Sequence, residues 1–145
     1  MNKILLAVAM SAILFCLNFT PKIFIGTEHE TIAVVDAREG LPITVEFVHS
    51  VQKTPVVEEL FFSGGEFVLR RTKYQSQGVG LPFDASDGKF RREGTHFVMD
   101  DMDRRFKSLE FRTGKGTRLT LTVDGRKFEL HKNFPTGTKI IVKTF

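Results

Sequence analysis

The chain has 145 residues, of which 41% are hydrophobic and 26% are charged, and its formal net charge is +4. That length fits one domain with a modest core, and the ordinary apolar content excludes a chain that is disordered throughout. The basic excess lies in the C-terminal half, without an Arg-rich helix, zinc-ligand spacing or aromatic–basic motif. A solvated face is therefore favoured over a nucleic-acid surface.

The chain begins with an apolar segment. Lys3 precedes Ile4 to Phe19, a run without charged residues. Such a run behind a positive charge predicts export, and as a helix it would be about 24 Å long. No small-x-small cleavage site follows it, which favours an uncleaved signal anchor over a cleaved signal peptide for residues 1–20.

An uncleaved anchor sets the topology. Lys3 would stay in the cytoplasm, which places the C-terminal body of this single-pass protein outside the cytoplasmic membrane. Cleavage would instead leave a secreted or periplasmic domain. The only cysteine, Cys16, lies in the segment, so the body has neither a disulfide nor a Cys metal ligand. Residues 21–30 are expected to link the segment to a β domain at residues 31–145.

From Thr31 onward the apolar period is mostly two, which is typical of β-strands. Ile43, Val45 and Phe47 share one strand face with His49. Further strands are expected at residues 56–62, 67–74, 90–93, 96–99, 106–113, 117–123, 127–132 and 138–144, with a solvated turn at 100–105. About eight or nine short strands joined by hairpins predict an all-β antiparallel sandwich or barrel-like sheet, preceded by one N-terminal membrane helix.

Two polar runs, Val45–Glu59 and Lys73–Pro82, hold most of the chemically versatile side chains. A neutral His49 could bind a metal or transfer protons. Without a ligand spacing, a partly buried histidine satisfied by a carbonyl or carboxylate is favoured. Neighbouring strand residues point to opposite faces, so His49 cannot pair with Ser50, and no nucleophile-elbow motif supports a hydrolase.

The same alternation separates Glu58 from Glu59. One of them would point inward beside apolar residues and would need a partner. The candidate partners are His49, Lys53, Tyr74 and an Arg. A structural polar network is therefore favoured over a pair of catalytic carboxylates.

The other histidines give no metal site. They lie on separate predicted segments without His-x-His or His-x-x-x-His spacing, so neither a metal nor another cofactor is assigned. These residues are His29, His96 and His131.

The glycines of the second polar run permit close approach of a ligand. Backbone N–H groups of residues 75–80 could bind an anion, but the run lacks the Lys-Ser/Thr ending of a P-loop. A tight loop crossing between sheets is favoured, and ligand binding is the alternative.

Several motifs together resemble the bacterial domain-of-unknown-function family eighteen-fifty, from about Leu41 to the C-terminus. The motifs are Val48-His49-Ser50-Val51, Thr54-Pro55, Glu58, Tyr74-Gln75-Ser76 and Gly78-Val79-Gly80-Leu81-Pro82, together with Gly94 and Arg105. The resemblance nominates a shared ligand- or partner-binding site with no catalytic residue assigned. Its members would be His49, Ser50, Thr54, Glu58, Tyr74, Ser76, Gly78, Gly80 and Pro82.

The resemblance implies a membrane-anchored extracytoplasmic accessory of a TAXI-type TRAP solute transporter, which contacts the permease or its solute-binding protein. Two alternatives stay open. One is a small extracytoplasmic enzyme, hydrolase-like, with His49 and Glu58 as acid/base groups. The other is a module that binds a small carboxylate or other organic anion. A non-enzymatic accessory is the favoured interpretation.

Overall fold

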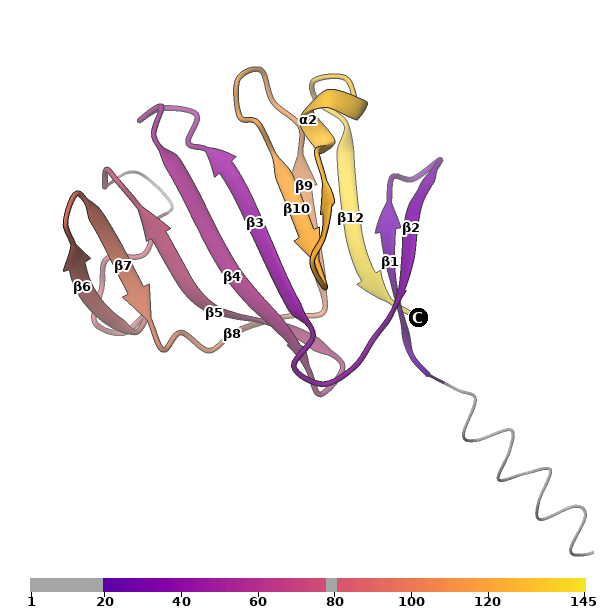
Figure 1. The fold of residues 1–145 in the computed structure, drawn as a ribbon, viewed down its shortest axis with the longest axis horizontal. Helices are drawn as coiled ribbons and strands as arrows, with labels where there is room; N and C mark the ends of the chain where they lie inside the picture. The colour runs from indigo at the N-terminus through magenta and orange to yellow at the C-terminus, as the bar shows by residue number, and fades with distance from the viewer. Residues whose placement is uncertain (1–19, 78–80) are drawn as a thin grey trace, which may run out of the picture.

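The computed structural model describes residues 20–77 and 81–145. In that part of the chain, twelve strands form two antiparallel sheets, with one short helix near the C-terminus (Figure 1). The predicted all-β antiparallel fold is confirmed. The expected N-terminal helix lies outside the described residues, and no helix within them is long and apolar enough to cross a membrane.

Short turns join most of the successive strands. The strands are β1 (Lys22–Gly26), β2 (Thr31–Asp36), β3 (Pro42–Val48), β4 (Pro55–Ser63), β5 (Glu66–Tyr74), β6 (Lys89–Glu93), β7 (His96–Asp100), β8 (Arg104–Phe106), β9 (Ser108–Arg112), β10 (Thr120–Val123), β11 (Arg126–Phe128) and β12 (Lys139–Thr144); the helix is α2 (Leu130–Asn133).

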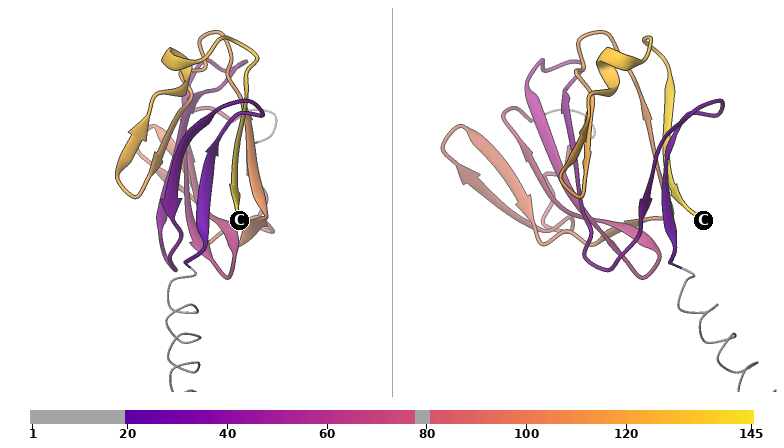
Figure 2. Two further views of the ribbon diagram at one scale, coloured as in Figure 1. Left: turned by 90° about the vertical axis from the view of Figure 1, so that its right-hand side faces the viewer. Right: turned by 45° about the vertical axis from the view of Figure 1, so that its right-hand side comes forward.

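The two sheets differ in size. The smaller has the order β2-β1-β12-β9, and the larger has the order β11-β10-β3-β4-β5-β7-β6, with β8 pairing with β5 outside this path. Figure 2 shows the sheets as two layers that face each other. Because β9 stands last in the order of the smaller sheet, it is an edge strand of that sheet.

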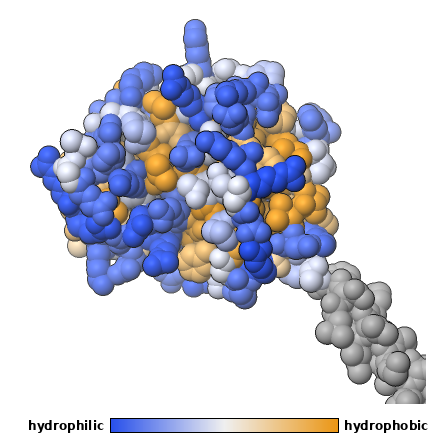
Figure 3. Space-filling model, in the orientation of Figure 1, coloured by the Kyte–Doolittle hydropathy of each residue, from blue (hydrophilic) through white to orange (hydrophobic). Residues whose placement is uncertain are grey.

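The core lies between the facing sides of the sheets. Period-two alternation sends Ile23, Ile25 and Val142 inward from the smaller sheet, each fully buried. Val45 and Leu121 do the same from the larger sheet. Figure 3 shows a mostly hydrophilic surface with apolar residues exposed over β1 and β2, where half of Val34 is exposed.

The segment expected to be a linker supplies a strand. Residues 21–30 contain β1, which lies between β2 and β12 in the smaller sheet. Ile23 and Ile25 are both fully buried there. Burial of these two side chains explains why the chain joins the sheet directly after residue 21.

Three C-terminal boundaries also differ from the expectation. The strand expected from residue 117 begins at Thr120, because Arg118 has a φ of 49° and turns the chain. The strand expected at 127–132 ends at Phe128, and α2 follows with Leu130 buried. The expected solvated turn at 100–105 instead buries Met102 and leads into β8.

Candidate functional site: a groove around Glu58

Glu58 lies on the inner face of the larger sheet. Its cross-strand neighbours are Val45 on β3 and Thr72 on β5, and Thr72 in turn pairs with Met99 on β7. All three neighbours are completely buried. Strand alternation therefore places one carboxyl group in a row of buried side chains, as expected for one member of the Glu58–Glu59 pair.

A groove of about 280 Å³ lies over Glu58, between the inner face of the larger sheet and the chain from β8 to β9. Buried apolar residues contribute to its lining, and the half-buried rings of Phe106 and Phe111 form part of its wall. The complete lining is Val45, Glu58, Leu60, Leu69, Arg104, Phe106, Ser108, Leu109, Glu110 and Phe111.

The Glu58 carboxylate has neither a hydrogen bond nor an ion pair within residues 20–77 and 81–145. Burial raises its pKa above the usual value for glutamate, and the charge of Arg104 offsets part of that rise. A half-buried carboxylate without a direct partner is an unfavourable arrangement for stability. It is therefore the strongest sign of a site in this fold.

Arg104 supplies the positive charge of the groove. On β8 it pairs with Leu69, so both side chains lie on the inner face of the sheet. Its guanidinium carbon is 6.0 Å from the ring centroid of Phe106, and no carboxylate in the described chain forms an ion pair with it. Glu110 differs, because its carboxylate lies 3.1 Å from Nζ of Lys139.

The groove continues along β9. A second hollow of about 270 Å³ shares Glu110 and Phe111 with the first. It is also lined by Phe47 and Leu119. The two hollows together offer a charged end near Glu58 and, beyond Phe111, an end where Phe47 and Leu119 lie beside Arg112 and Thr117.

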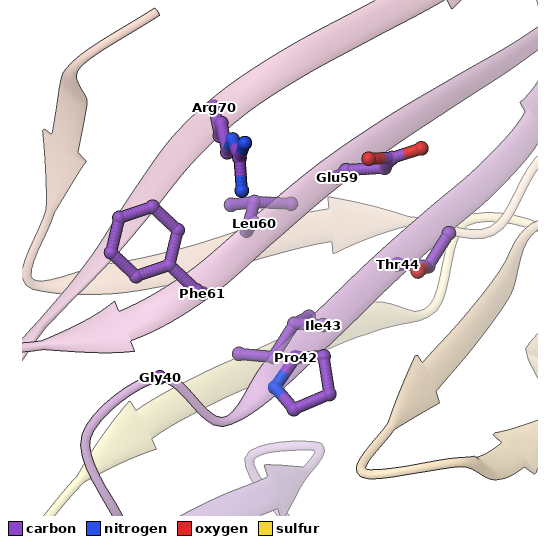
Figure 4. A pocket seen from close by; sticks show the side chains of 8 residues that line it. All are labelled: Gly40, Pro42, Ile43, Thr44, Glu59, Leu60, Phe61 and Arg70. Carbon is purple, nitrogen blue, oxygen red and sulfur yellow. The ribbon is translucent and has the colours of Figure 1, made fainter. Parts of the chain in front are cut away.

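A third hollow, of about 350 Å³, lies over β3 and β4 and reaches Arg70 (Figure 4). Figure 4 shows the Arg70 side chain extending toward Leu60, with Glu59 farther along β4. Glu59 lies on the outer face and already contacts Arg71, at 3.4 Å between Oε2 and Nη1. This hollow lacks an unpaired buried charge and is the weaker candidate site.

His49 braces the turn that joins β3 to β4. Its ring Nδ1 accepts hydrogen bonds from the backbone N–H groups of Val51 and Gln52, at 3.3 and 3.2 Å. Its own backbone N–H donates to the carbonyl of Thr54 at 2.9 Å. The His49 side chain is therefore a buried partner of the turn, and Ser50 beside it is exposed.

Thr54 lies at the other end of this turn. Its Oγ1 is buried and has no hydrogen-bond partner among the described residues. Neither His49 nor Thr54 lines the groove around Glu58. The acid/base pair of His49 and Glu58 that the enzyme hypothesis requires is thus not brought together in that groove.

Tyr74 joins the second polar run to the sheet. Its side chain is fully buried, and its hydroxyl donates to the carbonyl of Pro82 at 2.5 Å. Val56 and Leu81 pack against it, and burial raises its pKa. Leu81 and Pro82 therefore lie against the Val56–Tyr74 pair, which is the next row of the inner face after Glu58. Ser76 is half-buried, whereas Gly78 and Gly80 lie outside the described residues.

The groove contains residues that sequence reasoning missed. Arg104 and Phe106 were expected in a turn and at a strand start, and Phe111 within an ordinary strand. Residues 104–106 are Arg-Arg-Phe, which has no apolar–polar alternation, so the local sequence carries no signal for a strand there. Only pairing of β8 with β5 brings Arg104 to the face that carries Glu58.

These features define an all-β, sandwich-like domain with a small groove of mixed charge. The chain belongs to the family described as "Domain of unknown function (DUF1850)", whose model matches residues 43–130. That range includes every residue that lines the groove around Glu58. Neither a curated protein nor a solved structure matches the chain.

Proposed function

We propose that this protein is a non-enzymatic accessory of a TAXI-type TRAP solute transporter. Its N-terminal segment would anchor it in the cytoplasmic membrane, with the β domain outside the cytoplasm. Its β domain would act by binding, with the groove around Glu58 as the binding surface. Membership of the DUF1850 family and the apolar run from Ile4 to Phe19 support this assignment. The permease and its solute-binding protein are the proposed partners.

The observation that carries the binding role is the carboxylate of Glu58. It lines an open groove, and its burial opposes the charged form. A side chain kept only for stability would be apolar or would have a hydrogen-bonding partner. An unpartnered group in a groove is typical of a surface that is completed by another molecule.

The proposal is tested by crosslinking the full-length protein in native membranes, followed by purification and mass spectrometry of its partners. We expect the permease or its solute-binding protein to be captured. Deletion of the β domain is expected to reduce solute uptake. Glu58→Gln should reduce uptake as well, while the matched outer-face variant Glu59→Gln should not.

Two outcomes would contradict the proposal. One is the absence of any transporter component among the crosslinked proteins. The other is unchanged uptake after deletion of the β domain. Protease treatment of intact spheroplasts tests the proposed location separately, since an extracytoplasmic domain should be digested without lysis.

A further inference from the structure

Two charged groups of opposite sign line the groove without direct partners. Glu58 has no hydrogen bond or ion pair in the described chain, and the Arg104 guanidinium lies against the ring of Phe106 without a hydrogen bond or ion pair there. The third charged residue, Glu110, is held by Lys139. The groove therefore offers one negative and one positive group to an incoming molecule.

The sheet geometry keeps these two groups apart. Glu58 is on β4 and Arg104 is on β8, and β5 lies between these strands. Two strand spacings and an offset of two residues along β4, since Arg104 lies in the row of Leu60 and Leu69, separate their backbones by roughly 12 Å. Arg104 is close enough to lower the pKa of Glu58, but the two side chains form no ion pair. A small molecule can therefore fit between their charged ends.

The remainder of the groove is lined mostly by apolar side chains, apart from Ser108 and the paired Glu110. Leu60 and Leu69 are almost fully buried beneath it, and Phe106 and Phe111 line it. Beyond Phe111 the second hollow adds Phe47. Hollows of about 280 and 270 Å³ suit a molecule of amino-acid size.

We infer that the groove binds a free α-amino acid with an apolar side chain, whose ammonium group faces Glu58 and whose carboxylate faces Arg104. The apolar side chain lies along Phe111 toward the second hollow. This inference rests on the binding role proposed above and names the ligand class of that site.

Charge complementarity favours this ligand over a simple ion. An organic cation would pair with Glu58 but would be repelled by Arg104. An organic anion would pair with Arg104 but would be repelled by Glu58. A zwitterion satisfies both groups in one molecule. Each charge-assisted hydrogen bond strengthens binding by about tenfold or more.

The test is titration calorimetry of the full-length protein in detergent with three related probes. L-Phenylalanine carries both charges, N-acetyl-L-phenylalanine keeps only the carboxylate, and L-phenylalaninamide keeps only the ammonium. We expect L-phenylalanine to bind at least about tenfold more tightly than either derivative, because each derivative loses one charged contact. L-Leucine is expected to bind as well.

Two variants test whether the ammonium group of the ligand contacts Glu58 and its carboxylate contacts Arg104. Glu58→Gln should lower the affinity for L-phenylalanine and L-phenylalaninamide. Its affinity for the N-acetyl derivative should be unchanged or higher. Arg104→Gln should lower the affinity for L-phenylalanine and the N-acetyl derivative. Its affinity for L-phenylalaninamide should be unchanged or higher. Glu59→Gln, on the outer face, is the matched control and should bind all three probes like the unaltered protein. Circular dichroism melting verifies that each variant is folded.

Equal affinity for L-phenylalanine and one derivative would overturn the inference in favour of a simple anion or cation. Binding that is unaffected by both variants would place the ligand elsewhere. Binding of none of the probes by the folded protein would also overturn it. The transporter assignment would survive each of these results, because the crosslinking experiment tests it independently.

Discussion

Glu58 and Glu59 are adjacent in the chain but lie in opposite electrostatic environments. Glu59 faces outward and contacts Arg71, which also binds Asp100. Arg91 binds Asp100 as well, so the carboxylates of this outer surface have cationic partners. Glu58 faces inward, where burial raises its pKa and no ion pair forms within the described chain.

The contrast shows that pairing distinguishes a structural charge from a candidate binding charge. Strands β4, β5, β7 and β6 place acidic and basic residues next to one another on the outer face, as sheet neighbours that stabilise one another modestly. The inner face has a carboxylate and a guanidinium that stay apart. The following predictions test how strongly the two faces differ.

The largest difference should appear when a second acid is added to each face. Val45→Asp places a carboxylate in the fully buried row opposite Glu58 and should destabilise the domain by about 3–5 kcal/mol. Thr44→Asp places it opposite Glu59 on the outer face and should cost less than about 1 kcal/mol. Urea unfolding measures both. Similar losses would show that the two faces are not electrostatically distinct.

Breaking the outer network should have an intermediate effect. Burial raises the pKa of Asp100, but hydrogen bonds from Arg71 and Arg91 outweigh burial and hold it below the usual value. Asp100→Asn should cost about 1.5–3 kcal/mol at neutral pH, because charge-assisted hydrogen bonds are lost. The side chain of Asp100 is only 17% exposed, whereas that of the matched control Asp103 is 70% exposed.

The pH dependence gives the check on Asp100. Its pKa is lower in the folded state than in the unfolded state. Its stabilisation of the folded state is therefore complete above the unfolded pKa and is lost as pH falls through the folded pKa. The cost of Asp100→Asn should therefore shrink in acid. A cost that does not change with pH, or an equal cost for Asp103→Asn, would contradict the proposed role of the network.

Removing the inner charge should stabilise the protein. Glu58→Gln keeps the side-chain shape without the buried charge, so Tm at neutral pH should rise by about 2–4 °C, or about 1 kcal/mol. Folding raises the pKa of Glu58, so the side chain destabilises the folded state only as pH rises above the unfolded pKa. The gain should thus vanish near about pH 4. Glu59→Gln should give no gain, and a lower Tm for Glu58→Gln would show that Glu58 is a stabilising group.

The smallest effect concerns the loop next to the groove. Tyr74→Phe removes the hydroxyl that donates to the Pro82 carbonyl, and should cost about 0.5–1.5 kcal/mol. Hydrogen exchange of residues 81–88 should accelerate, while exchange of β3 and β4 stays unchanged. Tyr74→Leu, which also disturbs the packing on Val56, should cost more. No change in either measurement would mean that the hydroxyl does not hold the loop.

Local patterning anticipated much of the fold. Alternation along residues 43–47 predicted that Ile43 and Val45 share one strand face, and both are buried. Alternation along residues 56–62 predicted that one of Glu58 and Glu59 points inward, and the burial of Leu60 and Phe62 shows that it is Glu58. The hairpin between β4 and β5 turns at Gly64-Gly65, whose positive φ of 59° and 84° is a conformation that glycine adopts readily. These features depend on neighbouring residues, so they can be read from a short window of sequence.

The candidate site was anticipated only in part. The separation of Glu58 from Glu59 followed from strand alternation, whereas the nomination of Glu58 followed from the resemblance to the family. Arg104, Phe106 and Phe111 were not foreseen, because their partners lie far away in the chain. The motif residues also divide in the structure: His49 and Thr54 lie in a turn, Tyr74 holds a loop, and Glu58 lines the groove.

Sequence alone therefore defined the strand periodicity, the hairpin turns, the presence of one inward carboxylate in the Glu58–Glu59 pair and the apolar N-terminal run, since each depends on residues close together in the chain. Tertiary structure alone decided that β1 joins the smaller sheet, that β8 pairs with β5, and that Glu58 has no direct partner in the described chain. These outcomes depend on long-range strand pairing. That pairing sets which distant side chains share a face and how far apart their charges remain.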